Sequence, residues 1–113
     1  MIIYHNPRCK KSRAGLAYLQ EKGIEPEIIP YLKENALTHE KLDDLLKKMG
    51  KAPTEIIRTQ EKEYKEHFKG HEYSRDEWID ILIAHPKLIQ RPIITDGKQA
   101  VIGDPVEAIE VLL

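Results

Sequence analysis

The sequence predicts an α/β fold in a single domain over residues 1–113, and three patterns lead to this prediction. A strand–helix–strand unit opens the chain, a mostly helical stretch follows, and a β-hairpin with a closing helix ends it. The length suits one domain with one modest core, since longer chains usually split.

The strand–helix–strand unit comes first. Residues 2–4 are apolar and largely β-branched and stop at an Asn-Pro turn signal, which is typical of a short buried strand. Helix formers dominate residues 10–22, and residues 27–29 give a second short strand between two prolines. Such a unit pairs its strands in parallel through a right-handed crossover. The buried face of the helix is predicted to carry Ala14, Ala17 and Tyr18, with Leu16 and Leu19 near it.

A helical insertion is expected over approximately residues 36–88. Thr38 is placed to cap a helix with leucines at helical spacing, and Gly50 is placed to end it. Thr54 is expected to begin a short helical turn that runs to Arg58. Ser74 opens a Ser-x-x-Glu capping box in front of another apolar helix face.

The end of the chain returns to sheet. Residues 92–95 and 99–102 are apolar and flank an Asp-Gly turn, which is a hairpin signal. Asp104 is expected to cap the last helix, with Pro105 in its first turn. The complete order, β-α-β, helices, β-β-α, is that of a thioredoxin-like (glutaredoxin-like) mixed sheet with a helical insertion in its middle.

Composition limits the possible functions. The chain has 18 Lys and Arg against 19 Asp and Glu, a net charge of -1, whereas nucleic-acid and membrane binders usually carry a basic excess. One cysteine cannot form an internal disulfide, and no apolar run approaches the roughly 20 residues that span a bilayer. We therefore expect a cytoplasmic monomer that binds neither nucleic acid nor membranes.

The single cysteine, Cys9, is the candidate reactive group. It lies between the first strand and the first helix, where free backbone N–H groups and the helix dipole favour a thiolate and also bind oxyanions. Four of the six residues 8–13 are Lys or Arg, and cations beside a cysteine lower its pKa. His5, across the turn, could add an imidazolium or a hydrogen bond. We interpret Cys9 as a reactive thiol rather than a core residue.

Several segments in order along nearly the whole chain resemble the ArsC-type, glutaredoxin-linked arsenate reductases. The segments are Tyr4–Cys9, Arg13, Ile56–Arg58, His85-Pro86 and Gln90–Ile93.

The resemblance implies a role for each matching residue. Cys9 corresponds to the nucleophile, and His5 to a histidine that favours its thiolate. Arg58 and Arg91 correspond to arginines that hold the arsenate oxyanion, which suits their planar guanidinium groups. Pro92 corresponds to a cis-proline. The family implies no bound cofactor, glutathione as co-substrate and glutaredoxin as partner.

One departure leaves two alternatives open. The family commonly has an arginine at the position of Asp104, and a carboxylate there would repel an oxyanion. The chain could therefore be a glutathione-dependent thiol reductase that does not act on arsenate. The related Spx-like proteins bind RNA polymerase and sense oxidants through Cys-x-x-Cys, but Ser12 replaces the second cysteine, so such a regulator would lack the disulfide switch.

A metal site is not expected. His67 and His71 have helical spacing, but Gly70 interrupts the helix and the sequence offers no third ligand beside them.

Overall fold

The computed structural model describes residues 1–33 and 35–113 and contains one four-stranded mixed sheet with the strand order β2-β1-β3-β4. Strand β1 pairs in parallel with β2 and antiparallel with β3, and β3 pairs antiparallel with β4. The predicted parallel unit and hairpin are both confirmed, and the thioredoxin-like fold class with them. The strands are β1 (Ile2–Tyr4), β2 (Glu27–Ile29), β3 (Ile93–Thr95) and β4 (Ala100–Ile102).

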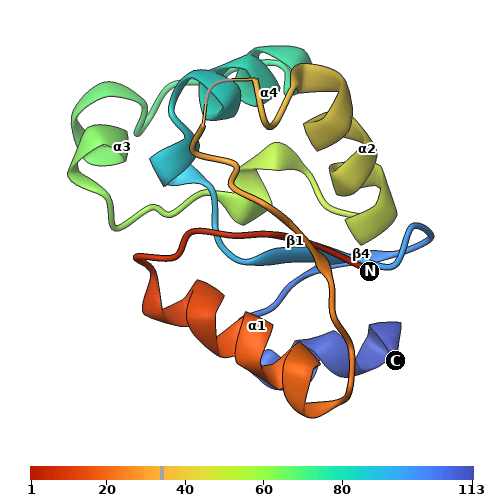
Figure 1. Ribbon diagram of the computed structural model, residues 1–113. Coiled ribbons are helices and arrows are strands. Elements are labelled where there is room, and N and C mark those ends of the chain that lie inside the picture. Colours follow the sequence, from red (N-terminus) through yellow and green to blue (C-terminus); the bar gives the residue numbers. More distant parts are fainter. Residues whose placement is uncertain (34) are drawn as a thin grey trace.

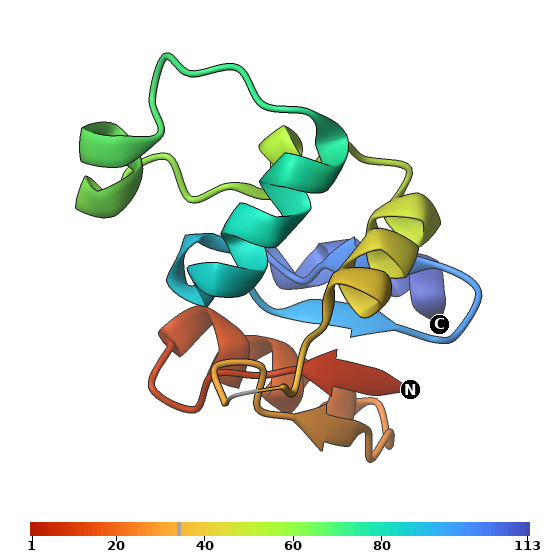
Figure 2. The ribbon, with the colours of Figure 1, turned by 90° about the horizontal axis from the view of Figure 1, so that it is seen from above.

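Helices cover both faces of this sheet (Figure 1). Helix α1 and the last 3₁₀-helix, η3, lie on one face, whereas α2 and α4 lie on the other. Helix α3 lies at the periphery, as Figure 2 shows from above. In the described part of the chain, every helix is too short or too polar to cross a bilayer. The helices are α1 (Lys10–Glu21), α2 (His39–Met49), η1 (Pro53–Ile56), α3 (Lys62–His67), α4 (Arg75–Ala84), η2 (Pro86–Leu88) and η3 (Val106–Leu112).

The alternation of side chains along the strands divides the core into two clusters. Ile3 and Ile94 are register partners, and both pack with the residues of α1 and η3. Their neighbours Tyr4 and Ile93 pack on the opposite face with the helical insertion. Because successive side chains of a strand point to opposite faces, a three-residue strand is enough to contact both layers.

The predicted caps of the insertion are confirmed. The Oγ1 atom of Thr38 accepts a hydrogen bond from the N–H of Lys41 at 3.2 Å, and Gly50 ends α2 in the left-handed conformation with φ 69°. Ser74 and Glu77 form the capping box, with each side chain accepting from the other's N–H. These local signals therefore place both ends of α2 and the start of α4.

The predicted buried face of α1 is wrong. Its buried residues are Ser12, Gly15 and Leu19, whereas Ala14 and Ala17 are exposed. The reason is a close approach: a Cβ on Gly15 would lie 2.7 Å from Cγ of Pro92. Small residues therefore face the sheet, and hydrophobicity alone does not identify this face.

One predicted helix end and one predicted helix start are also wrong. The turn expected over residues 54–58 is η1, which ends at Ile56, and Ile57 instead forms an antiparallel bridge with Ile89. The N-cap of η3 is Pro105, so Asp104 does not cap it. The carboxylate of Asp104 pairs with another element, as described below.

We predict that Gly15→Ala destabilises the protein by about 1 kcal/mol. Alanine is favoured over glycine in a helix by about 1 kcal/mol, but overpacking against the Pro92 ring costs about 1 to 3 kcal/mol. Urea denaturation measures the free energy of unfolding. Ala17→Met, which adds volume on the exposed face of α1, is the control and is expected to change stability by less than about 0.5 kcal/mol. A Gly15→Ala protein as stable as the wild type would contradict this packing.

Candidate active site

The loop that carries Cys9 is held by its own hydrogen bonds. The backbone N–H of Cys9 donates to the carbonyl of Asn6 at 3.0 Å, and the N–H of Arg8 donates to Oδ1 of Asn6 at 3.0 Å. The guanidinium of Arg13 donates to the carbonyl of Pro7 at 2.9 Å, which ties the first turn of α1 to the loop. This network fixes the position of Cys9 as the N-cap of α1.

The Cys9 thiol has a lowered pKa. Burial by itself raises the pKa, but the backbone N–H of Ser12, the Arg91 guanidinium and the backbone N–H of Lys11 together outweigh it. The Nε atom of Arg91 donates to the Cys9 sulfur at 3.2 Å. The residue Cys9 is partly exposed, and its thiol is free. A thiolate stabilised in this way is the nucleophilic form of cysteine.

Two short extended segments bring the arginines together. The N–H of Arg58 donates to the carbonyl of Leu88 at 2.7 Å, and the N–H of Gln90 donates to the carbonyl of Ile56 at 2.8 Å. This pairing sets Arg58 beside the segment that ends in Arg91. The Arg91–Pro92 peptide bond, which joins this segment to β3, is cis.

The two guanidinium groups converge on one acceptor. The Nη1 atoms of Arg58 and Arg91 donate to the carbonyl oxygen of Lys87 at 3.5 and 3.4 Å. Arg58 also pairs with the carboxylate of Glu61 at 2.6 Å. Two like charges held this close form a site that attracts an anion, and guanidinium forks suit tetrahedral oxyanions.

A polar cavity of about 260 Å³ lies at these arginines. It is smaller than the roughly 300–1,000 Å³ of pockets for drug-sized ligands, so it suits a small ion. Cys9 is not among its described lining residues, but Arg91 both lines the cavity and contacts the Cys9 sulfur, which places the thiol next to it. Its lining residues are Lys11, Arg58, Gln60, Gln90, Arg91, Ile102 and Asp104.

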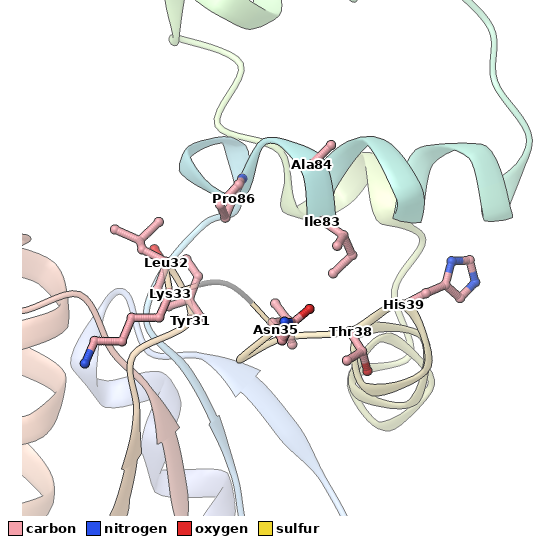
Figure 3. Close-up of a pocket in the computed structure, with 10 residues that line it drawn as sticks. Tyr31, Leu32, Lys33, Asn35, Thr38, His39, Ile83, Ala84 and Pro86 are labelled. Atoms are coloured by element: carbon pink, nitrogen blue, oxygen red, sulfur yellow. The ribbon is translucent and has the colours of Figure 1, made fainter.

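A larger cavity, of about 490 Å³, lies between the segment after β2, the start of α2 and the end of α4 (Figure 3). Neither Cys9 nor an arginine is among its described lining residues. Size alone would favour this cavity, but the smaller one has two converging arginines in its lining, and one of them, Arg91, contacts the Cys9 sulfur; this identifies the smaller cavity as the candidate active site.

His5 is buried beside this loop. Its backbone N–H donates to the carbonyl of Ile29 at 2.8 Å. Within the described chain, the Nδ1 atom of its imidazole ring has no hydrogen-bond partner. Burial and the charge of Arg13 both lower the pKa of the imidazole. The lowered pKa disfavours an imidazolium beside Cys9.

Sequence reasoning missed two polar residues of this region. Ser12 is completely buried, and its N–H contributes to the lowered pKa of Cys9. Its position three residues after a helix N-cap was the available signal. Tyr31 is 4% exposed, and burial raises the pKa of its hydroxyl. The charge of Arg91 lowers this pKa, whereas the Cys9 thiolate raises it further. No pattern in the sequence indicates that Tyr31 lies near Cys9 and Arg91, because both are distant from it along the chain.

Comparison with known proteins extends these observations. A sequence model of the ArsC family matches residues 4–112. The chain is 41% identical to the uncharacterized protein YfgD of Escherichia coli strain K12, over 95% of this chain and 91% of that protein. It is 39% identical to an arsenate reductase of Haemophilus influenzae, over 96% and 95%. The solved arsenate reductase of Vibrio cholerae superposes with a TM-score of 0.91 at 39% identity, covering 99% of this chain and 96% of that one.

We predict that Arg91→Met slows alkylation of Cys9 by iodoacetamide at pH 7 about tenfold, because the sulfur loses the cation that favours its thiolate. The measurement is the alkylation rate as a function of pH, whose midpoint should move to higher pH. Arg8→Met is the matched control, since it removes an exposed charge from the neighbouring residue. Equal effects of the two substitutions would show that the general field, rather than the Arg91 contact, activates the thiol.

Proposed function

The chain belongs to the ArsC family and is a thiol oxidoreductase of that type, and we propose that it reduces arsenate to arsenite with glutathione and glutaredoxin. One observation carries the proposal: the Arg91 guanidinium lies 3.2 Å from the Cys9 sulfur and lines a cation-rich cavity sized for a small oxyanion.

In the first step the oxyanion binds beside Arg58 and Arg91. The Cys9 thiolate attacks arsenic, a sulfur–arsenic bond forms and one arsenate oxygen leaves as water after taking up two protons. The guanidinium groups stabilise the negative charge that collects on the oxygens in the transition state. The backbone N–H groups of Lys11 and Ser12 favour the thiolate that attacks.

In the second step glutathione attacks the arsenic–cysteine adduct. Arsenic gains two electrons and leaves as arsenite, while the two sulfurs are oxidised to a mixed disulfide between Cys9 and glutathione. A glutaredoxin thiolate then takes the glutathionyl group and returns Cys9 to its thiolate. An external thiol is required because the chain has one cysteine and cannot form an internal disulfide.

One observation favours a second candidate function. The Asp104 carboxylate lines the cavity, where it opposes the binding of an oxyanion. A glutathione-dependent thiol reductase that does not act on arsenate would use the same thiolate and the same external thiols, with a glutathionylated protein or small molecule as substrate.

We predict that the purified protein forms arsenite from arsenate when glutathione and glutaredoxin are present, and that Cys9→Ser lowers the rate at least about a thousandfold, because the nucleophile is lost. Arsenite is measured directly, and glutathione oxidation is followed in parallel. Circular dichroism of Cys9→Ser provides the control for folding.

Each other outcome identifies a different function. Turnover of a glutathionylated substrate without arsenite formation would support the thiol reductase and refute arsenate reduction. Failure of both reactions, together with co-purification of RNA polymerase, would support the regulator.

A further inference from the structure

Negatively charged groups near the cavity offset the positive charges of the two arginines. Arg58 is already paired with Glu61 at 2.6 Å, and the Asp104 carboxylate lies in the same lining. The positive charge of Arg58 is set against Glu61 and that of Arg91 against the Cys9 thiolate, which leaves the charge of Asp104 without a counterpart among these residues. The remaining charged residue of the lining, Lys11, therefore decides whether this negative charge is offset.

Lys11 is held at the cavity by Asp104. Its Nζ atom lies 2.9 Å from Oδ2 of Asp104, and the two side chains come from different elements, the first turn of α1 and the turn between β4 and η3. Both side chains remain partly exposed, 56% for Lys11 and 42% for Asp104, so the ion pair lies at the cavity mouth.

Lys10 does not share this position. It precedes Lys11 in the first turn of α1 and is exposed, but it is not among the residues that line the cavity. The two lysines have the same chemistry and nearly the same distance from Cys9 along the chain. Comparing substitutions of the two lysines therefore separates the effect of a charge that lines the cavity from the effect of a charge near it.

We propose that Lys11 is a specificity-determining residue of this site, which neutralises the Asp104 carboxylate and makes the cavity accept a doubly charged tetrahedral oxyanion. The inference rests on the proposed function in that it concerns the same anion site. Lys11, on α1, would then supply the positive charge that an arginine commonly supplies in the family at the position of Asp104.

The ammonium group suits this role. It is a compact point charge on a flexible stem, so it can contact a carboxylate and an anion together or move between them. Because the pair is partly exposed, water and salt weaken its interaction with an anion, and changes of severalfold rather than many thousandfold are expected.

The test uses inorganic phosphate as a tetrahedral dianion that cannot be reduced. Bound phosphate slows the alkylation of Cys9, and the phosphate concentration that halves the rate measures affinity independently of each variant's own rate. Wild type, Lys11→Met, Asp104→Asn, the double variant and Lys10→Met are compared at constant ionic strength.

Lys11→Met should weaken phosphate binding about five- to tenfold, whereas Lys10→Met should change it less than about twofold. Asp104→Asn should strengthen binding about threefold. The double variant should return to within about twofold of wild type, because the carboxylate that Lys11 neutralises is gone. Lys11→Arg should retain most of the affinity.

The inference is overturned if Lys11→Met and Lys10→Met have equal effects, or if the double variant binds as weakly as Lys11→Met. It is also overturned if phosphate does not protect wild-type Cys9. The protein could bind phosphate in a manner that depends on Lys11 and yet form no arsenite. This result would support the inference about Lys11 and refute the proposed function, so the experiment distinguishes failure of the one from failure of the other.

Discussion

The contact between the Arg91 guanidinium and the Cys9 sulfur is the interaction on which the site depends. The two residues are 82 positions apart in the chain, and the sheet brings them together. Register pairs Tyr4 with Ile93, so the loop after β1 and the segment before β3 leave the sheet at the same end. Burial by itself would raise the pKa of the thiol, so the lowered pKa requires this cation and the N–H groups of α1.

Close packing at Pro92 holds this geometry. A Cβ on Gly15 would lie 2.7 Å from the ring of Pro92, and a Cβ on Gly103 would lie 3.1 Å from it. The N–H of Gly103 also donates to the carbonyl of Pro92 at 2.8 Å. Helix α1 and Gly103, the residue directly after β4, therefore both pack closely against the proline that follows Arg91.

Much of the fold follows from local rules that the sequence displays. The hairpin, the parallel unit and the ends of α2 were predictable because turn residues, caps and periodicity act over a few neighbouring positions. The buried face of α1 was not, because Gly15 faces the sheet for reasons of space. Similarly, Asp104 resembles an N-cap locally, and only the folded chain shows that it meets Lys11. In the candidate site, Cys9 carries a local signal at a helix start, whereas the charge balance of the cavity depends on side chains from separate elements.

The two arginines differ in the groups that they contact. Arg91 donates to the sulfur itself, so its position is set by the nucleophile. Arg58 is held by Glu61, a carboxylate three residues along the chain that an incoming oxyanion can replace. A doubly charged anion gains more from this exchange than a singly charged one, because the interaction scales with the product of the charges. The same exchange is possible at Lys11, whose present partner is Asp104. In the proposed function, a cavity in which Arg58 and Lys11 are paired with carboxylates would discriminate between anions by charge, while the contact between Arg91 and Cys9 favours the thiolate.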